Sequence, residues 1–335
     1  MSVAIINARL LDPATGLDTV GAILLERGQI RDIRKGADAT FDNAKEVLDA
    51  GGHCVAPGLI DLRVKTGEPG AEQKETLATA SRAALAGGIT SVVVMAGTRP
   101  VIDDLALVQF IAERARETAK ARIYPSGALT LGLAGEAMAE IGLMADAGAV
   151  MFTNGDWPVA SAQVMKRAMA YAASRGASVM ARPDERTLTG SGVMNAGAFA
   201  ARAGLSGMPV EAEWIGAARD VMLAEQTGCR LILDQVSTAR TLEIAEAARD
   251  RGAKIYATTA AHSLFFNERD VGDYLPYCKV NPPFRDEDTR QDLIRALKDG
   301  LIDAVVSAHD PQPPEETRLP FGEAAFGAAG LETVL

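Results

Sequence analysis

Residues 57–69 read Pro-Gly-Leu-Ile-Asp-Leu-Arg-Val-Lys-Thr-Gly-Glu-Pro, and this stretch decides the fold class. Its first residues lie in an apolar strand predicted over residues 54–61, and the alternate positions 63 and 65 project beyond the end of that strand. In a parallel barrel, side chains just past the carboxyl end of a strand line the mouth of the active site. Arg63 and Lys65 are therefore the first candidate site residues.

The rest of the chain repeats this pattern. From residue 54 onward, short apolar runs alternate with Ala-rich amphipathic segments. Eight strand–helix units predict an α/β fold of the TIM (β/α)8 barrel class rather than an open doubly wound sheet. The predicted strands lie near residues 54–61, 90–95, 122–128, 149–153, 178–182, 230–235, 254–259 and 303–307, and the predicted helices near 75–87, 103–118, 135–146, 161–175, 211–226, 238–251, 286–298 and 320–335.

The first fifty residues have a different pattern. Short apolar segments at 3–11, 21–26 and 29–34 are separated by turn signals, which is typical of a small β-meander or sandwich. We therefore expect a small β domain over residues 1–52 and the barrel over 53–335. The sequence stops at Leu335 inside an apolar helical pattern, so we expect a fragment that lacks the C-terminal part of the β domain.

Composition narrows the class of protein. The net charge of −10 argues against a nucleic-acid or anionic-membrane binder, and no apolar run reaches the length needed to span a membrane. The three cysteines are widely spaced and form no CxxC pair, so we expect reduced thiols and a cytoplasmic location. The chain has only three histidines, which leaves few ligands for a zinc site.

Ten short motifs, in their order along the chain, resemble dihydroorotase of the long, pyrimidine-pathway type, a family of the amidohydrolase superfamily. Each motif alone is weak, and their order and spacing carry the resemblance over essentially all 335 residues. The motifs are Asn7-Ala-Arg-Leu-Leu-Asp-Pro13, Ala56-Pro-Gly-Leu-Ile-Asp61, Glu68-Pro-Gly70, Lys74-Glu-Thr76, Ala86-Gly-Gly-Ile-Thr-Ser-Val-Val-Val-Met95, Ala139-Glu-Ile-Gly-Leu143, Gln235-Val-Ser-Thr238, Asn281-Pro-Pro-Phe-Arg285, Ser307-Ala-His-Asp-Pro311 and Gly330-Leu-Glu-Thr333.

The resemblance implies functional residues that this chain lacks. It implies zinc-ligand histidines at positions 63, 65, 182 and 235 and a bridging carboxylate near position 154. It also implies a substrate-binding arginine at 67, a substrate-binding asparagine at 97 and a catalytic aspartate at 308. The residues present are Arg63, Lys65, Arg182, Gln235, Asn154, Gly67, Gly97 and Ala308, with Asp156 and Asp310 as nearby substitutes for the two acids.

Among the groups that the resemblance implies, Asp61, Asn281 and His309 remain. A hydrolytic zinc site needs at least three imidazole, thiolate or carboxylate ligands and an open position for water, and the cationic side chains of Arg and Lys cannot be ligands. We therefore predict no catalytic residues, no metal and no cofactor. The alternative is an active zinc-dependent cyclic-amide hydrolase with a rearranged site built from Asp61, Asp156, His309 and Asp310.

Arg63, Lys65 and Arg182 place positive side chains where the metal ions would lie. The first interpretation is charge compensation, in which these cations pair with Asp61 and the other remaining acids, because an unpaired buried carboxylate costs several kcal/mol. The alternative is an anion or vestigial substrate pocket. Its candidate residues are Asp61, Arg63, Lys65, Arg182, Asn281 and His309.

Three further side chains near the barrel mouth have simpler interpretations. His262 is predicted to have a structural role near the end of the seventh strand. Trp157 is predicted to fill the space left by the metals and the substrate. His309 is either a remnant binding residue or a hydrogen-bond partner of Asp310.

Three functions follow from these observations. The resemblance implies a catalytically inactive homologue in pyrimidine biosynthesis that acts as a structural partner of aspartate carbamoyltransferase, in a homo- or hetero-oligomer. The second possibility is the active hydrolase with the rearranged site. The third is a small-anion-binding module.

Overall fold

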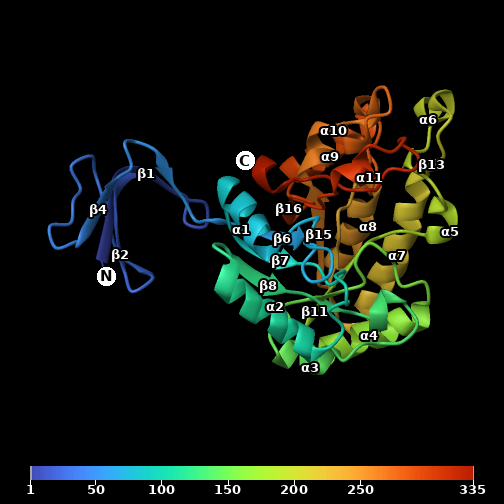
Figure 1. The fold of residues 1–335 in the computed structure, drawn as a ribbon, viewed down its shortest axis with the longest axis horizontal. Helices are drawn as coiled ribbons and strands as arrows, with labels where there is room; N and C mark the ends of the chain where they lie inside the picture. The colour runs from blue at the N-terminus through green and yellow to red at the C-terminus, as the bar shows by residue number, and fades with distance from the viewer. Residues whose placement is uncertain (1, 335) are drawn as a thin grey trace. The chain divides into compact units, whose positions relative to one another are not determined.

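The computed structural model describes residues 2–334 and consists of two compact units, one over residues 1–59 and the other over residues 60–335 (Figure 1). The predicted boundary was at residues 52–53. The difference arises because Cys54–Val55, expected in the first barrel strand, pairs with the first strand of the β unit instead. The predicted strand over 54–61 is therefore two separate strands.

The N-terminal unit is a β unit as predicted, but it is one mixed sheet rather than a meander or a sandwich. Its strands are β1 (Ser2–Asp12), β2 (Leu17–Glu26), β3 (Gln29–Lys35), β4 (Glu46–Asp49) and β5 (Cys54–Val55). The order is β3-β2-β1-β4, with β5 also pairing with β1. β1 and β2 are antiparallel, whereas β4 and β5 run parallel to β1. A small core that includes Ala4, Ala22 and Phe41 packs on this sheet.

The second unit is the predicted TIM barrel. Its strands pair in parallel and are short and largely buried, as expected when helices cover the sheet. Lys65 N donates to the carbonyl of His309 at 2.9 Å, which joins the last strand to the first and closes the barrel. The strands are β6 (Leu59–Val64), β7 (Ile89–Val94), β8 (Arg122–Pro125) continued by β9 (Gly127–Ala128), β10 (Phe152–Thr153), β11 (Ser178–Ala181), β14 (Arg230–Leu233), β15 (Ile255–Ala260) and β16 (Ala304–Val306).

The helices between these strands begin and end within a few residues of the predicted bounds, except α3. N-caps explain several starts: Thr76, Asp104, Ser161 and Asp286 each accept a hydrogen bond from a backbone N–H of the first helical turn. The helices are α1 (Leu77–Ala86), α2 (Leu105–Thr118), α3 (Ile141–Asp146), α4 (Ala162–Ser174), α7 (Val210–Thr227), α8 (Ala239–Asp250) and α10 (Glu287–Lys298).

The prediction of a last helix over 320–335 is wrong for residues 320–334, and Leu335 lies outside the described residues. Within residues 320–334 the helical structure is limited to a 3-10 turn η4 (Leu331–Thr333), and the short helix α11 (Pro314–Thr317) ends before this range. Gly327 has a φ of 131°, which a helix does not allow. Lys279 Nζ holds the same segment by donating to the carbonyls of Gly322 and Ala324 at 2.9 and 2.7 Å.

Two other segments differ from the prediction. The helix expected over 135–146 starts only at Ile141, because Gly135 has a positive φ and Thr130 forms a β-bridge with Met138. Between β11 and α7 the chain makes an unpredicted excursion of short elements that reaches the carboxyl side of the barrel. These are α5 (Arg186–Thr189), β12 (Met194–Asn195), α6 (Ala198–Ala203) and β13 (Gly207–Met208).

The barrel interior is apolar below its mouth. Val93 and Met95 at the end of β7, Met151 just before β10 and Met180 in β11 form a buried cluster, with Leu62 and Ile232 packed against it. This cluster is the base on which the polar side chains of the mouth rest. Across residues 2–334, no helix combines the length and the apolarity needed to cross a membrane.

Candidate functional site

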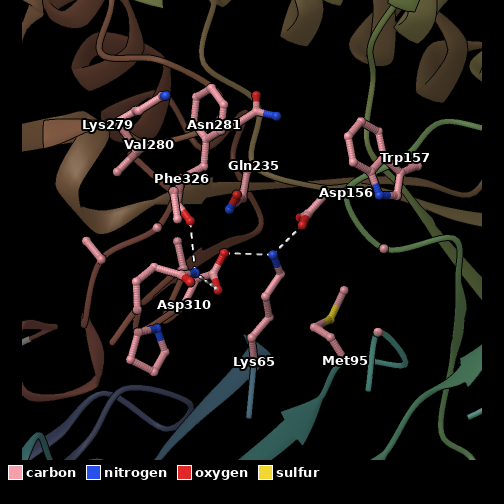
Figure 2. A pocket seen from close by; sticks show the side chains of 18 of the residues that line it. Lys65, Met95, Asp156, Trp157, Gln235, Lys279, Val280, Asn281, Asp310 and Phe326 are labelled. Atoms are coloured by element: carbon pink, nitrogen blue, oxygen red, sulfur yellow. Dashed lines mark hydrogen bonds and ion pairs between the residues drawn. The ribbon is translucent and has the colours of Figure 1, made fainter. Parts of the chain in front are cut away.

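A cavity of about 690 Å³ opens at the carboxyl ends of the barrel strands. Figure 2 shows Lys65 rising from the strand below, with Asp156 and Asp310 on either side of its ammonium group. Met95 from the apolar cluster lies at the base, and Asn281 and Gln235 lie above Lys65 in this view. The cavity is where a parallel barrel normally carries its functional residues.

Arg63 lies within β6 rather than beyond it, and its side chain is almost completely buried. Its Nη2 donates to Asp156 Oδ1 at 2.5 Å, and its Nε donates to Asp234 Oδ2 at 3.1 Å. Burial alone would lower the pKa of Arg63, but the charges of Asp234, Asp156 and Asp310 raise it above its ordinary value. Arg63 is therefore a fixed cation tied to two acids from other strands.

Lys65 is the first residue after β6 and bridges two carboxylates. Its Nζ donates to Asp156 Oδ2 and, at 2.7 Å, to Asp310 Oδ2 (Figure 2). Asp156 follows β10 and Asp310 follows β16, so one ammonium group connects three loops of the barrel mouth. Both acids that could have replaced the lost carboxylates are thus occupied by a cation.

Arg182 directly follows β11, and its Nη2 donates to Gln235 Oε1 at 2.8 Å. The same nitrogen lies 3.7 Å from Asp156 Oδ1. Its Nε and Nη1 are buried without a hydrogen-bond partner among the described residues. Burial and the nearby charge of Arg63 lower the pKa of Arg182, although Asp234, Asp156 and Asp184 act in the opposite direction.

Asp156 is the acid on which the three cations converge. Burial pushes its pKa upward, but the charges of Lys65, Arg63 and Arg182 outweigh burial and hold the pKa well below its usual range. The carboxylate therefore remains ionised at any physiological pH. A carboxylate in this state is a poor proton acceptor, because its conjugate acid is too strong.

Asp61 does not pair with these cations, so that part of the charge-compensation prediction is wrong. The buried carboxylate accepts hydrogen bonds from the backbone N–H groups of Arg63 at 3.0 Å and Ser307 at 3.2 Å. Burial raises its pKa, and the two N–H donors and Arg63 only partly offset this. Asp61 thus joins the first and last strands beneath the cavity.

His309 does not bond Asp310, contrary to one of the two interpretations offered for it. Its Nε2 lies 3.3 Å from Glu75 Oε2, and its Nδ1 accepts from the backbone N–H groups of Gly330 and Leu331 at 3.2 and 3.4 Å. The ring is buried and holds the C-terminal segment against the start of α1. Neither ring nitrogen is available to a metal or a ligand in this arrangement.

The six residues predicted for an anion pocket separate into two groups. Arg63, Lys65 and Asn281 line the cavity, whereas Asp61, Arg182 and His309 lie behind its wall. His262 also lines the cavity, and its Nε2 is buried without a hydrogen-bond partner among residues 2–334. Burial, with the charges of Arg63 and Arg182, lowers the pKa of His262 to about 4, so the ring is neutral at pH 7.

The positions of the other missing family residues have local structural explanations. Asn154 holds a turn: its Oδ1 accepts from Thr130 at 2.5 Å, and its Nδ2 donates to the carbonyls of Leu133 and Trp157. A Cβ on Gly67 would overlap the carbonyl oxygen of Ala71, whereas a Cβ on Gly97 would meet only a leucine methyl at 3.8 Å. The loop at position 67 is therefore incompatible with an arginine, and position 97 has room for a side chain.

Gln235 and Ala308 share an unusual backbone. Both have a φ of 54°, in the left-handed region, at the point where a strand turns into the cavity rim. Gln235 lies where the resemblance implies a zinc-ligand histidine and is held by Arg182. Ala308 has no group that could accept a proton.

The side chains present do not fit a zinc ion. Among residues 2–334, no three His, Cys, Asp or Glu side chains converge on a point where a metal could bind. Of the rearranged set, Asp156 and Asp310 are bridged by Lys65, while Asp61 and His309 are engaged with backbone N–H groups. Zinc requires at least three such donors, and guanidinium and ammonium groups cannot replace them.

Two features of the site were not predicted correctly. Asp234, the second partner of Arg63, was overlooked, although an acid at the end of the apolar run Leu231–Leu233 lies where a parallel barrel places its functional residues. Trp157 does not fill the interior: its side chain is 52% exposed, and the guanidinium of Arg186 stacks 4.2 Å from its ring centroid. The indole therefore forms part of the cavity rim (Figure 2).

Comparisons with known proteins agree with the motifs. Residues 52–241 match the family described as Dihydro-orotase-like. The chain is 41% identical to the dihydroorotase of Syntrophotalea carbinolica and 39% identical to that of Pelobacter propionicus, in each case over all of this chain and 78% of the relative. The fold matches an L-hydantoinase (dihydropyrimidinase) from Arthrobacter aurescens with a TM-score of 0.87 and 26% identity, over 99% of this chain and 75% of that one.

A D-hydantoinase (dihydropyrimidinase) from Thermus sp. matches with a TM-score of 0.80 and 23% identity, over 98% of this chain and 74% of that chain, and this likeness shows the fold alone. The relatives, the matched family and the order of the motifs point in one direction. The chain belongs to the dihydroorotase family of the amidohydrolase superfamily.

Proposed function

We propose that this chain is a non-hydrolytic member of the dihydroorotase family that serves pyrimidine biosynthesis as a structural partner of aspartate carbamoyltransferase. One observation carries the proposal: at positions where the resemblance implies zinc-ligand histidines, Arg63, Lys65 and Arg182 are ion-paired or hydrogen-bonded to neighbouring side chains. A site filled by fixed cations has no position at which a hydrolytic metal ion and its water could be held.

The chemistry of the remaining acids supports the same conclusion. A family-type hydrolysis needs a base that takes a proton from the attacking water. Ala308 lies at the position that the resemblance assigns to this base, and its neighbour Asp310 accepts hydrogen bonds from Lys65 at 2.7 Å and from Gln312 at 2.9 Å. Asp156 is held ionised by three cations. Both acids near the position of this base are therefore already hydrogen-bonded to cationic side chains.

The proposed partnership rests on the family resemblance. The barrel is closed and its mouth is joined by ion pairs, so the fold is kept while the ligand set is lost. A protein of this kind can still contribute through its surface. The resemblance implies aspartate carbamoyltransferase as the partner, and a hetero-oligomer with it is the expected assembly.

The absence of hydrolysis is tested by measuring activity and metal content together. We expect the purified full chain to contain far less than one zinc per chain and to leave dihydroorotate and carbamoyl aspartate unchanged. The Syntrophotalea carbinolica dihydroorotase, purified and assayed in parallel with added zinc, is the positive control. Stoichiometric zinc together with dihydroorotate hydrolysis above the no-enzyme rate would show that the site is catalytic.

The partnership requires a separate experiment. The chain is co-expressed with the aspartate carbamoyltransferase of the same organism, and the purified mixture is analysed by size-exclusion chromatography with light scattering. We expect one co-eluting species whose mass equals a whole-number combination of the two chains. Separate elution at micromolar concentrations of both proteins would rule out the structural partnership and leave the conclusion on hydrolysis untouched.

A further inference from the structure

The side chains that line the cavity carry a net positive charge. Six cationic side chains and two carboxylates line it among the described residues, although the whole chain has a net charge of −10. A cavity with one sign of charge in a protein of the opposite overall sign concentrates counter-ions at that place. The lining cations are Arg63, Lys65, Lys74, Arg99, Arg186 and Lys279, and the lining carboxylates are Asp156 and Asp310.

The floor of the cavity is close to neutral. Arg63 and Lys65 are matched by Asp156, Asp310 and the buried Asp234 at distances of direct ion pairs. An anion arriving at these two cations would have to displace carboxylates that are already hydrogen-bonded to them. An anionic ligand would therefore gain little binding energy at the floor. This corrects the expectation that Arg63 and Lys65 bind the anion.

The surplus charge is on the rim. Lys74 donates to the neutral Gln312 Oε1 at 2.8 Å, and Arg186 lies over the ring of Trp157. Lys279 is buried and donates to two backbone carbonyls, while Arg99 is exposed. Over residues 2–334, no carboxylate oxygen lies within 4.0 Å of any of these four cations. Their partners are neutral, so their charge is not compensated locally.

These four rim cations come from different loops. Lys74 precedes α1, Arg99 follows β7, Arg186 begins α5 and Lys279 follows the 3-10 turns after β15. In Figure 2, Lys279 and Trp157, the residue over which Arg186 stacks, lie on opposite sides of the cavity. An ion with one anionic group, such as a single phosphate, contacts one side at a time, whereas a molecule with separated anionic groups can contact both.

We propose that this cavity binds a small organic molecule with two or more separated anionic groups, held by the rim cations Lys74, Arg99, Arg186 and Lys279 above a neutral floor. A volume of about 690 Å³ is within the ordinary range for metabolite-sized ligands. Arg99 and Arg186 suit phosphate or carboxylate oxygens because the guanidinium can donate two parallel hydrogen bonds. The exposed face of Trp157 and the neutral side chains of Asn281 and His262 can contact the uncharged part of the ligand.

The ligand chemistry is tested with two multivalent probes that differ in the source of charge, inorganic pyrophosphate and citrate. Each is titrated into the full chain and followed by calorimetry and thermal shift. KCl holds the ionic strength constant within each titration, and the titrations are repeated at several KCl concentrations. We expect one of them to bind with a stoichiometry near one and to raise the melting temperature. Binding should weaken as KCl is increased, because Lys74, Arg99 and Arg186 are solvent-accessible.

The site is tested with a triple variant, Lys74→Gln, Arg99→Gln and Arg186→Gln, which leaves the buried Lys279 in place. Loss of three charge-assisted contacts should weaken binding at least about tenfold. The matched control is Arg82→Gln, Lys166→Gln and Arg167→Gln, which removes the same charge from exposed helix positions outside the cavity.

Each outcome has a definite meaning. Binding of pyrophosphate alone identifies a phosphate-bearing ligand, binding of citrate identifies a polycarboxylate, and either one, lost in the rim variant only, supports the site. Equal loss in the rim and control variants would reduce the effect to overall charge and overturn the proposal. Lack of binding of both probes at 10-millimolar concentration, on the order of the weakest useful metabolite affinity, would overturn it as well.

Discussion

The Nε of Arg63 lies 3.1 Å from Oδ2 of Asp234, and both side chains are almost completely buried. The two residues are 171 positions apart and belong to the first and sixth strands of the barrel. An ion pair at this depth loses much of its hydration, and Arg63 meets the carboxylates of both Asp234 and Asp156 in return. The pair therefore ties the barrel mouth together where the family would hold a metal.

Removing one member of this pair should be costly. We expect Asp234→Ala to lower the free energy of unfolding by about 3–5 kcal/mol, because Arg63 is left buried with one fewer acid. The matched control is Asp146→Ala, which breaks the exposed ion pair with Arg175 in the same unit and should cost less than about 1 kcal/mol. Urea unfolding of both variants measures the difference, and equal losses would show that the buried pair has no special role.

Lys65 should stabilise the protein in a pH-dependent way. Its charge lowers the pKa of Asp156, so the stability supplied by this carboxylate is present above the ordinary carboxyl pKa and is lost as the pH falls through and below it. We expect Lys65→Met to lower the free energy of unfolding by about 2–4 kcal/mol at pH 7. The loss should shrink below pH 4. Lys166→Met, at an exposed position, is the control, and a loss that stays constant from pH 7 to pH 3 would contradict the proposed charge network.

The contribution of Asp220 to stability should depend on pH in the opposite direction. It is buried on α7, and burial raises its pKa to about 6 although Arg219 partly offsets the shift. A raised folded-state pKa gives stability that is present below the unfolded pKa and is lost as the pH rises through about 6. We expect the free energy of unfolding of Asp220→Asn, relative to that of the parent, to be about 2 kcal/mol higher at pH 8 than at pH 4.

Chemical denaturation at these two pH values measures this change. The exposed Asp250→Asn is the control, and it should differ from the parent by less than about 0.5 kcal/mol at both. A gain from Asp220→Asn that is the same at pH 4 and pH 8 would show that Asp220 does not titrate with a raised pKa.

The loop at position 67 should reject any side chain. A Cβ there overlaps the carbonyl oxygen of Ala71, so we expect Gly67→Ala to destabilise the protein by about 2–4 kcal/mol. Gly97→Ala is the matched control, because its Cβ meets only Leu133 Cδ1 at 3.8 Å, and it should be neutral within about 0.5 kcal/mol. Thermal unfolding of both variants tests this. A neutral Gly67→Ala would mean that the loop can shift, so that an arginine could be restored there.

The strand and helix bounds could be predicted because they depend on local signals. N-caps such as Thr76 and Asp286 mark helix starts, and apolar runs mark buried strands, so neighbouring residues carry the information. The cationic side chains at the strand ends, Arg63, Lys65 and Arg182, could be placed for the same reason, since their position depends only on where each strand ends. The last segment was predicted wrongly as a helix because its apolar pattern says nothing of Lys279, whose ammonium group binds two of its carbonyls.

The residues between 57 and 69 were thus enough to place Arg63 and Lys65 at the barrel mouth, at positions where the family resemblance implies histidines. The partners of these side chains follow from the folded barrel alone. The cations contact Asp156, Asp234 and Asp310, and Asp61 accepts hydrogen bonds from backbone N–H groups. The physical reason is distance along the chain. Strand position depends on a few adjacent residues, whereas an ion pair between positions 63 and 234 exists only after the barrel has closed and brought their strand ends together.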